Sequence, residues 1–305
     1  MPKDFLTLAD WTAEALGEIL ARAQVLRSLH RSGERPQTLQ GRTLAMYFEK
    51  PSLRTHVTFE AGMEQLGGHA VLLRPEQVGI GTRETPRDVA LNLSRWVDVI
   101  MARTFSHALI EQLAEEASIP IINGLTDLLH PCQAMADLQT IAAIMDPAEA
   151  KIAYVGDGNN VAHSLMLLCA VMGMQICIAA PEGHQPAVQI QRKAEKIAAE
   201  TGATIQVVED PATAVADVDF IYTDTWTSMG QEDEAEWRRQ VFAPYQVNAK
   251  LVELAPKAWL MHCLPAHRGE EITGDLLDGD RSLVYEQAEN RLHAQKAIVE
   301  HLLLA

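Results

Sequence analysis

The chain has 305 residues, of which 48% are apolar and 22% charged, and its formal net charge is -16. This length suits two domains of roughly 150 residues each, and the composition is typical of a packed globular protein. Nucleic acids and anionic membranes favour basic surfaces, so the charge argues against both as partners. A few converging arginines can still form a local site for a small anion in such a chain.

The sequence has no sign of a membrane span or of a disulfide scaffold. No apolar run reaches the roughly 18 residues that a membrane helix needs, and Met1–Phe5 lacks the features of a secretory signal. The four cysteines are scattered: Cys132, Cys169, Cys177 and Cys263. We therefore expect a cytoplasmic protein with reduced cysteines.

Helical and strand patterns alternate through the first half of the chain. It opens with an amphipathic helix that Thr12 can cap, and Thr85 can cap a later one. Strands are expected at Thr43–Phe48, His69–Leu73, Val99–Arg103 and Ile119–Asn123. Helices are expected at His56–Leu66, Pro86–Trp96, His107–Ala117 and Pro131–Met145. Between them, the polar segment Arg74–Glu84 is expected to be a long loop.

The alternation restarts after Asp146-Pro147. Strands are expected at Ile152–Gly156, Gln175–Ala180, Thr204–Val208, Phe220–Thr223, Trp259–His262 and Leu283–Tyr285. Helices are expected at Val161–Met172, Pro186–Glu200, Glu232–Val241, Asn248–Leu254 and Ala288–Leu304. This predicts an α/β fold of two domains, 1–145 and 146–287, each a mostly parallel sheet with helices on both faces. The helix 288–305 is expected to pack back on the first domain, with the active site in the cleft between the domains.

Polar motifs follow the strands at the positions where parallel sheets bind ligands. After the first strand, Ser52 can cap a helix whose first N–H groups, at Leu53, Arg54 and Thr55, would face an anion. The guanidinium of Arg54 matches a phosphate edge. An ordinary capped helix with a surface arginine explains the same residues equally well.

A second motif, His130-Pro131-Cys132-Gln133, lies where the fourth strand leads into a helix. His130 can donate to a carbonyl oxygen and Gln133 can bind an amide, and Arg103 ends the third strand on the same rim. A lone histidine at a helix start is more often structural.

Two motifs of the second half suggest different chemistries. Gly156 and Gly158 match a dinucleotide-binding loop, but Val161 stands at the third glycine position, so this match is weak. Asn160, at the same strand end, can bind a carboxylate or an amine. Asp224, directly after another strand, suits an ammonium group, although an Asx turn is the common alternative.

The last motif is Met261–Arg268, in which Cys263 ends a strand between two histidines. Structural zinc needs four ligands with paired spacing, and no second cluster is adjacent, so we expect no metal. His262 is expected to point to the opposite face of the strand from Cys263, which disfavours a cysteine nucleophile. Arg291, in the last helix, is either a surface charge or a further anion contact.

Taken together, these motifs resemble the aspartate/ornithine carbamoyltransferase family, over essentially the whole chain. Ser52–Thr55 matches its Ser-x-Arg-Thr phosphate motif, and His130–Gln133 matches its His-Pro-x-Gln motif. Asp224 with Ser228-Met229-Gly230 is similar to the ornithine branch, as is His262-Cys263-Leu264-Pro265. Two positions depart from many relatives, which have Thr at Leu53 and Arg at His56.

The resemblance implies an enzyme that transfers the carbamoyl group of carbamoyl phosphate to the δ-amine of L-ornithine, without a cofactor. It implies a homotrimer or a multiple of one. Carbamoyl phosphate would be bound by Ser52, Leu53, Arg54, Thr55, Gln77, Arg103, His130, Gln133, Cys263, Leu264 and Arg291, with Gln77 reaching the neighbouring subunit's site. Ornithine would be bound by Asn160, Asp224, Ser228 and Met229. Among these, Arg54, Arg103, His130 and Cys263 would be catalytic.

Three other functions compete with this one. A carbamoyltransferase for putrescine or an N-acylornithine would carry most of the same residues, but a free α-amino group best explains Asp224. A catalytically silent, partner-binding relative is disfavoured by the intact set of anion-binding residues. A nicotinamide-dependent oxidoreductase is disfavoured by Val161. The direction, arginine biosynthesis or its reverse in arginine catabolism, is left open by the residues.

Overall fold

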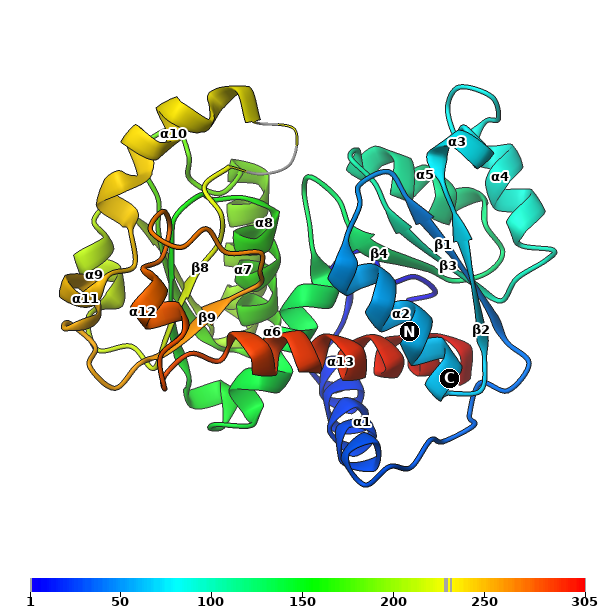
Figure 1. The fold of residues 1–305 in the computed structure, drawn as a ribbon, viewed down its shortest axis with the longest axis horizontal. Coiled ribbons are helices and arrows are strands. Elements are labelled where there is room, and N and C mark those ends of the chain that lie inside the picture. The colour runs from blue at the N-terminus through cyan, green and yellow to red at the C-terminus, as the bar shows by residue number, and fades with distance from the viewer. Residues whose placement is uncertain (1, 228–229, 231, 305) are drawn as a thin grey trace. The chain divides into compact units, whose positions relative to one another are not determined.

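The fold is described from a computed structural model that covers residues 2–227, 230 and 232–304 (Figure 1). The chain divides into two compact units. Unit 1 consists of Met1–Gln139 with Glu289–Ala305, and unit 2 consists of Thr140–Ala288. The boundaries fall inside two helices, α6 (Pro131–Ala142) and α13 (Val284–Leu304). The chain therefore passes from one unit to the other through continuous helices and not through loops.

Unit 1 is built on a four-stranded parallel sheet with the strand order β2-β1-β3-β4. Its strands are β1 (Thr43–Phe48), β2 (His69–Leu73), β3 (Val99–Arg103) and β4 (Ile121–Leu125). Strands β3 and β4 are buried along their whole length, as expected where both faces of a parallel sheet are covered. Three strands have the predicted bounds. The fourth begins two residues late, after Pro120, which has no N–H for the sheet.

Three helices of unit 1, α1 (Ala13–Arg31), α2 (Leu53–Gln65) and α4 (Pro86–Leu93), follow residues whose side chains cap them. Besides these and α6 and α13, the unit has α3 (Pro75–Val78) and α5 (His107–Glu116), with a short 3-10 turn at Leu8–Asp10. Thr12 and Thr85 accept hydrogen bonds from N–H groups in the first turns of α1 and α4, which confirms both predicted caps. The predicted loop Arg74–Glu84 contains α3, a single helical turn.

Unit 2 is built on a five-stranded parallel sheet with the strand order β7-β6-β5-β8-β9. Its strands are β5 (Lys151–Val155), β6 (Gln175–Ala179), β7 (Thr204–Val208), β8 (Phe220–Thr223) and β9 (Trp259–His262). Its other helices are α7 (Asn160–Met172), α8 (Val188–Thr201), α9 (Pro211–Val215), α10 (Ala235–Phe242), α11 (Ala249–Val252) and α12 (Gly274–Leu277). Short 3-10 turns lie at Pro147–Glu149, Glu232–Glu234 and Ala243–Tyr245. The predicted parallel α/β architecture is thus confirmed in both units.

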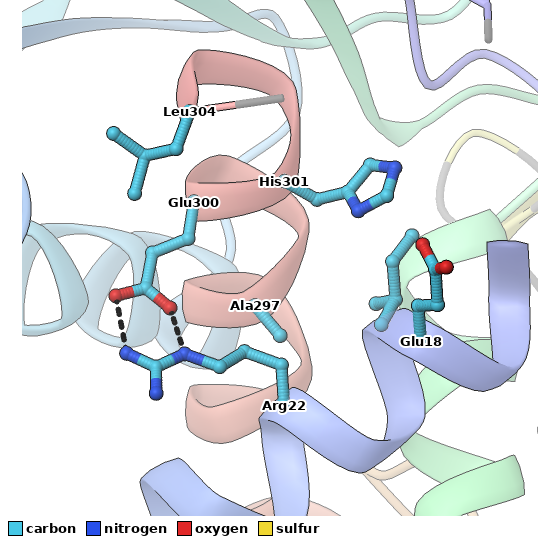
Figure 2. A pocket seen from close by; sticks show the side chains of 7 residues that line it. Glu18, Arg22, Ala297, Glu300, His301 and Leu304 are labelled. Atoms are coloured by element: carbon cyan, nitrogen blue, oxygen red, sulfur yellow. Dashed lines mark hydrogen bonds and ion pairs between the residues drawn. The ribbon is translucent and has the colours of Figure 1, made fainter.

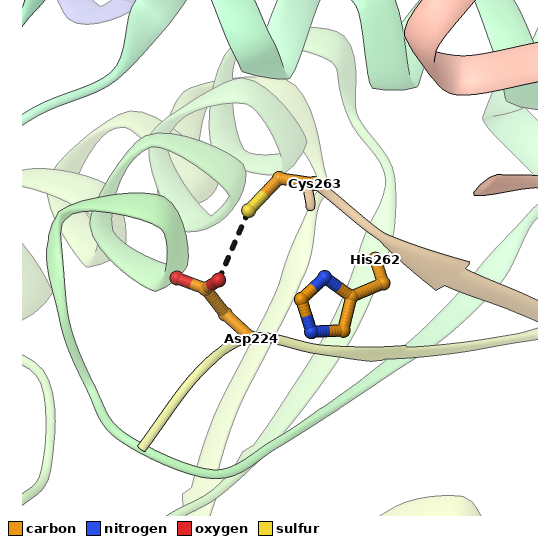
Figure 3. Close-up of side chains that lie close together, drawn as sticks. All are labelled: Asp224, His262 and Cys263. Carbon is orange, nitrogen blue, oxygen red and sulfur yellow. Dashed lines mark hydrogen bonds between the residues drawn. The ribbon is translucent and has the colours of Figure 1, made fainter. Parts of the chain in front are cut away.

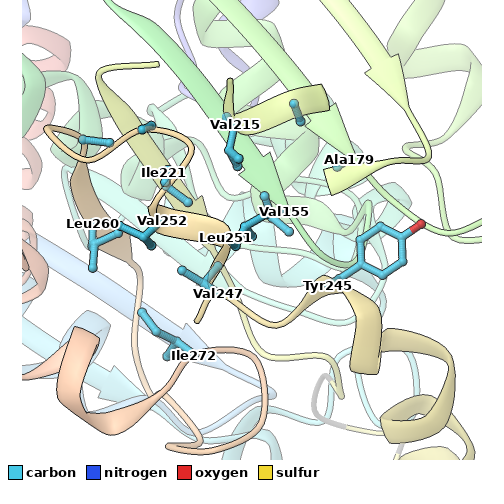
Figure 4. Packing of buried hydrophobic residues seen from close by; sticks show 14 of the residues in the cluster. Val155, Ala179, Val215, Ile221, Tyr245, Val247, Leu251, Val252, Leu260 and Ile272 are labelled. Carbon is cyan, nitrogen blue, oxygen red and sulfur yellow. The ribbon is translucent and has the colours of Figure 1, made fainter. Parts of the chain in front are cut away.

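The core of unit 2 joins its sheet to the short helices that follow (Figure 4). Val155 and Ile221 from the central strands pack with Val215 of α9 and Val252 of α11, and all four side chains are buried. At its edge, the Tyr245 hydroxyl donates to the Glu209 carbonyl at 2.7 Å, so the ring is buried without losing its polar contact. This core fixes the strands whose carboxyl ends carry the polar motifs of unit 2.

One predicted strand, Leu283–Tyr285, is wrong. Ser282 forms only an isolated bridge to Leu260, and α13 begins at Val284, four residues before the predicted helix start. The Leu283 carbonyl already accepts from the Gln287 N–H, as a helix-start residue does. A three-residue apolar run fits a strand and a buried helix start equally well, which explains the error.

Among the residues that the structure describes, no helix combines the length and the apolar character needed to cross a membrane.

Candidate active site

The turn after β1 carries the first predicted anion-binding residues. Ser52 is the N-cap of α2, as predicted, and its Oγ accepts from the Thr55 N–H at 3.2 Å. That N–H therefore donates to the cap, and its contact with an anion stays a prediction. Leu53 and Arg54 form the rest of this first turn, at the positive end of the helix dipole.

The side chains converge on the hydroxyl of Thr55. Arg291 donates to it from Nη2 at 3.0 Å, and Arg103 donates from Nη1 at 3.4 Å. The other terminal nitrogen of Arg291, Nη1, donates to Oε1 of Gln133 at 2.8 Å, and Gln133 donates to Asp137. All five residues are buried. Four residues predicted to bind carbamoyl phosphate thus form one hydrogen-bonded cluster in unit 1, which we call the cationic cluster: Thr55, Arg103, Gln133 and Arg291.

His130 lies at the start of α6 and is buried, as part of the same unit. Its burial, and then the charges of Arg291, Arg103 and Arg54, hold the pKa of the imidazole well below its ordinary value. The ring is therefore neutral at physiological pH. A neutral imidazole can donate one N–H to a carbonyl oxygen, which is the role that the sequence predicted, and it is a poor general acid.

The loops that carry these residues are tied to one another. Lys50, directly before the α2 turn, forms an ion pair with Asp127 in the loop after β4, and its ammonium lies 4.2 Å above the Phe105 ring. Glu49 accepts from the Phe105 N–H at 2.8 Å. No sequence pattern indicates the ion pair, because its partners are 77 positions apart. These contacts fix three strand-end loops of unit 1 in one arrangement.

Leu53 and His56, the two residues that differ from many relatives, have surroundings that fit their side chains. Leu53 is 76% exposed, so its side chain takes no part in the cationic cluster. The His56 ring lies against Phe48, with centroids 5.6 Å apart, and its Nε2 is 3.1 Å from Glu60. His56 therefore interacts within its own helix and with β1. Gln77, the predicted intersubunit residue, is exposed on α3, where its Oε1 accepts from the Arg74 N–H at 3.2 Å.

In unit 2, the Asp224 carboxylate lies just after β8 and is buried (Figure 3). Its Oδ1 accepts from the Cys263 thiol at 3.0 Å, and its Oδ2 accepts from the Asn159 amide at 2.8 Å. Cys263 follows β9, the neighbour of β8 in the sheet, so adjacent strand ends place the two side chains together. The thiol and the amide are neutral donors, which leaves the negative charge of the carboxylate available to a cationic ligand.

His262 lies beside this pair but is bonded elsewhere. Its Nδ1 accepts from the Leu264 N–H at 2.9 Å, so Nε2 carries the proton and faces Glu271 at 3.1 Å. The ligand atoms of His262, Cys263 and Asp224 lie within 4.8 Å of one another, a spacing that a metal could use. Both imidazole nitrogens are, however, committed to protein partners. In a second group, with His267 and Glu270, one oxygen of Glu271 is likewise committed, because Oε1 accepts from the His267 N–H at 2.6 Å as well as from His262.

Leu264 adopts a left-handed backbone conformation with φ of 59°, which non-glycine residues seldom do and which is common at ligand sites. It follows Cys263, the residue whose thiol contacts Asp224. Asn160 is the first residue of α7 and is half-buried, and its carbonyl accepts from the Ser164 hydroxyl. The predicted residues Ser228 and Met229 lie outside the described part of the chain.

The glycine-containing loop before α7 has a packing role. A Cβ at Gly158 would lie 2.3 Å from the Pro186 nitrogen, so this position needs glycine. Gly156 has φ of 137°, in the range that favours glycine. Close approach of two backbones at Gly158 and the positive φ of Gly156 thus explain these glycines without a dinucleotide.

A hollow of about 420 Å³ lies elsewhere in unit 1, between α1 and α13 (Figure 2). Arg22 donates to both carboxylate oxygens of Glu300 there, at 2.5 and 2.8 Å, and Glu18 and His301 lie on the rim. None of the residues that line this hollow is a predicted site residue, so the hollow has no assigned part in the reaction.

The fold and these side chains define a two-unit parallel α/β protein with a cationic cluster in one unit and a buried carboxylate in the other. Residues 3–143 match the family model described as the carbamoyl-P binding domain of aspartate/ornithine carbamoyltransferase, and residues 148–302 match its Asp/Orn binding domain. The chain belongs to the aspartate/ornithine carbamoyltransferase family.

Individual relatives cover nearly the whole chain. An ornithine carbamoyltransferase of Anoxybacillus flavithermus is 54% identical over 99% of this chain and 96% of its own length. The solved structure of the Pyrococcus furiosus ornithine carbamoyltransferase is 49% identical, with a TM-score of 0.96, and the match covers 98% of this chain and 96% of that one. That of Thermus thermophilus is 42% identical, with a TM-score of 0.88 over 99% of both chains.

Proposed function

We propose that this chain catalyses carbamoyl transfer from carbamoyl phosphate to the δ-amine of L-ornithine, giving L-citrulline and phosphate. The observation that supports this most directly is the opposite charge of the two sites. The cationic cluster suits a phosphate, and a carboxylate held by neutral donors suits an ammonium. Family membership over the full length adds the substrate classes that the two matched domain descriptions name.

Carbamoyl phosphate is assigned to the first domain, proposed as 1–145 with the returning helix 288–305. Its phosphate is assigned to Ser52, Leu53, Arg54, Thr55 and Arg103. Its carbamoyl end is assigned to His130, Gln133 and Arg291, together with Cys263 and Leu264 from the second domain. The contacts of Arg103 and Arg291 to the Thr55 hydroxyl support a shared role for these three residues.

Ornithine is assigned to the second domain, proposed as 146–287, through Asn160, Asp224, Ser228 and Met229. The Asp224 carboxylate would bind the α-ammonium group. Once that end is fixed, the δ-amine is the group left to react. Putrescine has no α-carboxylate and an N-acylornithine has no α-ammonium, so both are expected to be poor acceptors.

The reaction follows from these charges. The neutral δ-amine attacks the carbamoyl carbon, and the carbonyl oxygen becomes an oxyanion that Arg54, Thr55 and His130 stabilise. The neutral His130 ring contributes as an N–H donor. The tetrahedral intermediate then releases phosphate, whose oxygens accept the proton lost by the amine. Holding both substrates in register supplies a large part of the rate enhancement.

The direct test is a citrulline assay with carbamoyl phosphate and a panel of amines. We expect ornithine to be the best acceptor and activity to need no added metal or nucleotide. Faster turnover of putrescine or N-acetylornithine would contradict the proposed acceptor. Loss of activity with a chelator, restored by zinc, would contradict the metal-free mechanism.

We also propose a cytoplasmic homotrimer or a multiple of it, in which Gln77 reaches the neighbouring subunit's site. The exposure of Gln77 on a helical turn supports this assignment. Gln77→Ala should then lower activity without changing the stability of the subunit. Light scattering that finds a fully active monomer would refute the proposed assembly.

A further inference from the structure

Asn159 holds two elements of unit 2 at once. Its Oδ1 caps α7 by accepting from the N–H groups of Val161 and Ala162, at 2.9 and 3.3 Å. Its Nδ2 donates to Oδ2 of Asp224 at 2.8 Å. The two ends of one planar amide therefore serve different purposes. The oxygen starts a helix, and the nitrogen orients a carboxylate that lies 65 positions away in the sequence.

The amide itself is held in place before any ligand binds. The Tyr154 hydroxyl donates to the same Oδ1 at 3.3 Å. Burial, and then the charge of Asp224, raise the pKa of Tyr154 well above its ordinary value, so this hydroxyl keeps its proton. Next to Asn159, the Gly158 N–H donates to the His184 carbonyl at 2.8 Å. The direction of the Nδ2 group is consequently fixed by the fold.

The chemistry of the amide suits a carboxylate that has to bind a cation. A lysine or arginine at position 159 would also orient Asp224, but its charge would cancel that of the carboxylate. An amide donates a hydrogen bond and adds no charge. The Cys263 thiol on the other oxygen is likewise a neutral donor. This arrangement fixes the direction of the carboxylate and retains its full charge for the ligand.

We infer that Asn159 is a positioning residue that sets the orientation of Asp224 for the α-ammonium of ornithine, an inference that rests on the proposed function. Asn159 does not need to contact ornithine in this role. Asn160, its neighbour, is the residue assigned to the substrate. The inference explains why an asparagine, and not one of the other good N-cap residues, stands at this helix start.

The decisive variant is Asn159→Asp, because aspartate caps helices as well as asparagine does. It keeps the cap oxygen but replaces the donor with a second carboxylate oxygen facing Asp224. We expect the KM for ornithine to rise about tenfold or more, the loss typical of one hydrogen bond to a charged group. Carbamoyl phosphate binding, measured by calorimetry on the free enzyme, should stay within about twofold, since no assigned contact of that substrate changes.

The pH dependence of this variant distinguishes positioning from capping. Two facing carboxylates retain a shared proton to higher pH than either would alone. That proton restores a hydrogen bond between them, so the KM defect of Asn159→Asp should shrink as the pH falls from about 9 to about 6. A residue that only caps α7 would give a variant with the KM of the unmodified enzyme at every pH.

Two further variants complete the test. Asn159→Ser keeps a cap but has no amide, and it should raise the KM for ornithine without the pH effect, which covers the case in which Asn159→Asp fails to fold. Asn248 caps α11 in the same unit through the Leu251 N–H. The matched control Asn248→Asp should leave the KM for ornithine unchanged, because no carboxylate faces its amide among its described contacts.

The inference and the proposed function fail in different ways. If the unmodified enzyme forms no citrulline from ornithine, the proposed function is wrong. If the enzyme is active, but Asn159→Asp and Asn159→Ser both retain its KM for ornithine, Asn159 is a helix cap and nothing more.

Discussion

The two proposed ligand sites of this protein carry side chains of opposite charge. In unit 1, two buried guanidinium groups approach a single hydroxyl, that of Thr55, within a chain whose net charge is -16. In unit 2, one carboxylate is held by a thiol and an amide. The first site places two positive charges close together, and the second surrounds one negative charge with neutral donors. Net charge therefore says little about either, because local side chains decide which ion each site accepts.

The difference has an energetic consequence. Like charges that are buried close together disfavour each other, and a bound dianion relieves this cost. The cationic cluster is therefore expected to gain stability when phosphate binds. The Asp224 site already has its hydrogen bonds in place, so its ligand adds mainly a charge pair. We therefore expect substitutions in the cationic cluster to weaken carbamoyl phosphate binding, and substitutions at the Asp224 site to weaken ornithine binding.

The largest effect is expected for Arg291→Met. The variant removes the buried guanidinium that donates to Thr55 and to Gln133 and that is proposed to bind carbamoyl phosphate. One charge-assisted contact to the substrate contributes roughly 1.5–3 kcal/mol, so carbamoyl phosphate affinity should fall about tenfold to a hundredfold in calorimetry. The exposed Arg35 is the matched control, and Arg35→Met should leave this affinity unchanged. Unchanged affinity in Arg291→Met would remove Arg291 from the anion site.

The corresponding change in unit 2 is Asp224→Asn, with a somewhat smaller effect. Asparagine retains the shape but not the charge, so the KM for ornithine should rise roughly tenfold or more while turnover also falls. Carbamoyl phosphate binding to the free enzyme should be nearly unchanged. A variant that loses carbamoyl phosphate binding and keeps a normal KM for ornithine would show that the two substrates are assigned to the wrong units.

Most strands of both units, and the caps of three helices in unit 1, could be predicted because their signals are local. The apolar run Thr43–Phe48 and the cap residue Thr85 are each recognised within a few positions of the chain. The cationic cluster could not be derived in this way. Thr55 and Arg291 are 236 positions apart, and their contact depends on how α2 and α13 pack. The resemblance to a family supplied Arg291 as a candidate, and the fold supplied its partners.

Asn159 illustrates the same limit at shorter range. The sequence indicated a ligand-binding role for Asn160, in the loop after β5, and no role for Asn159. Both residues have the same side chain, and only the register of α7 decides which one caps the helix. Register at a helix start depends on backbone contacts such as that of Gly158 to His184, which no local pattern reveals.

A third prediction concerns stability, and it compares close packing in unit 2 with open packing in unit 1. A Cβ at Gly158 would lie 2.3 Å from the Pro186 nitrogen, so Gly158→Ala forces the backbone to move. We expect a loss of about 1–3 kcal/mol in the free energy of unfolding, measured with denaturant. Gly17 in α1 has no atom within 4 Å of such a Cβ. Gly17→Ala should therefore be neutral or stabilise by roughly 0.5–1 kcal/mol. Equal stability of both variants would contradict the packing argument.

The last prediction concerns the stability of unit 1 in acid. His293 of α13 is fully buried and packs edge-on against His30, with ring centroids 5.2 Å apart. Burial, followed by the charges of Lys296 and His30, lowers the pKa of His293 from 6.5 to about 4. The unfolded chain therefore binds a proton here at a higher pH than the folded chain does. Stability from this group is fully present above pH 6.5 and is lost as the pH falls towards 4.

This loss is limited to one proton, so its slope cannot exceed about 1.4 kcal/mol per pH unit. His293→Phe keeps an aromatic ring beside His30 and cannot titrate. Its Tm should consequently depend less on pH between 4 and 6.5 than the Tm of the unmodified chain. The matched control is His69→Gln, which removes an exposed imidazole from β2 and should retain the original dependence. Scanning calorimetry across this range measures both variants. Parallel curves for His293→Phe and the unmodified chain would show that His293 does not couple protonation to the stability of unit 1.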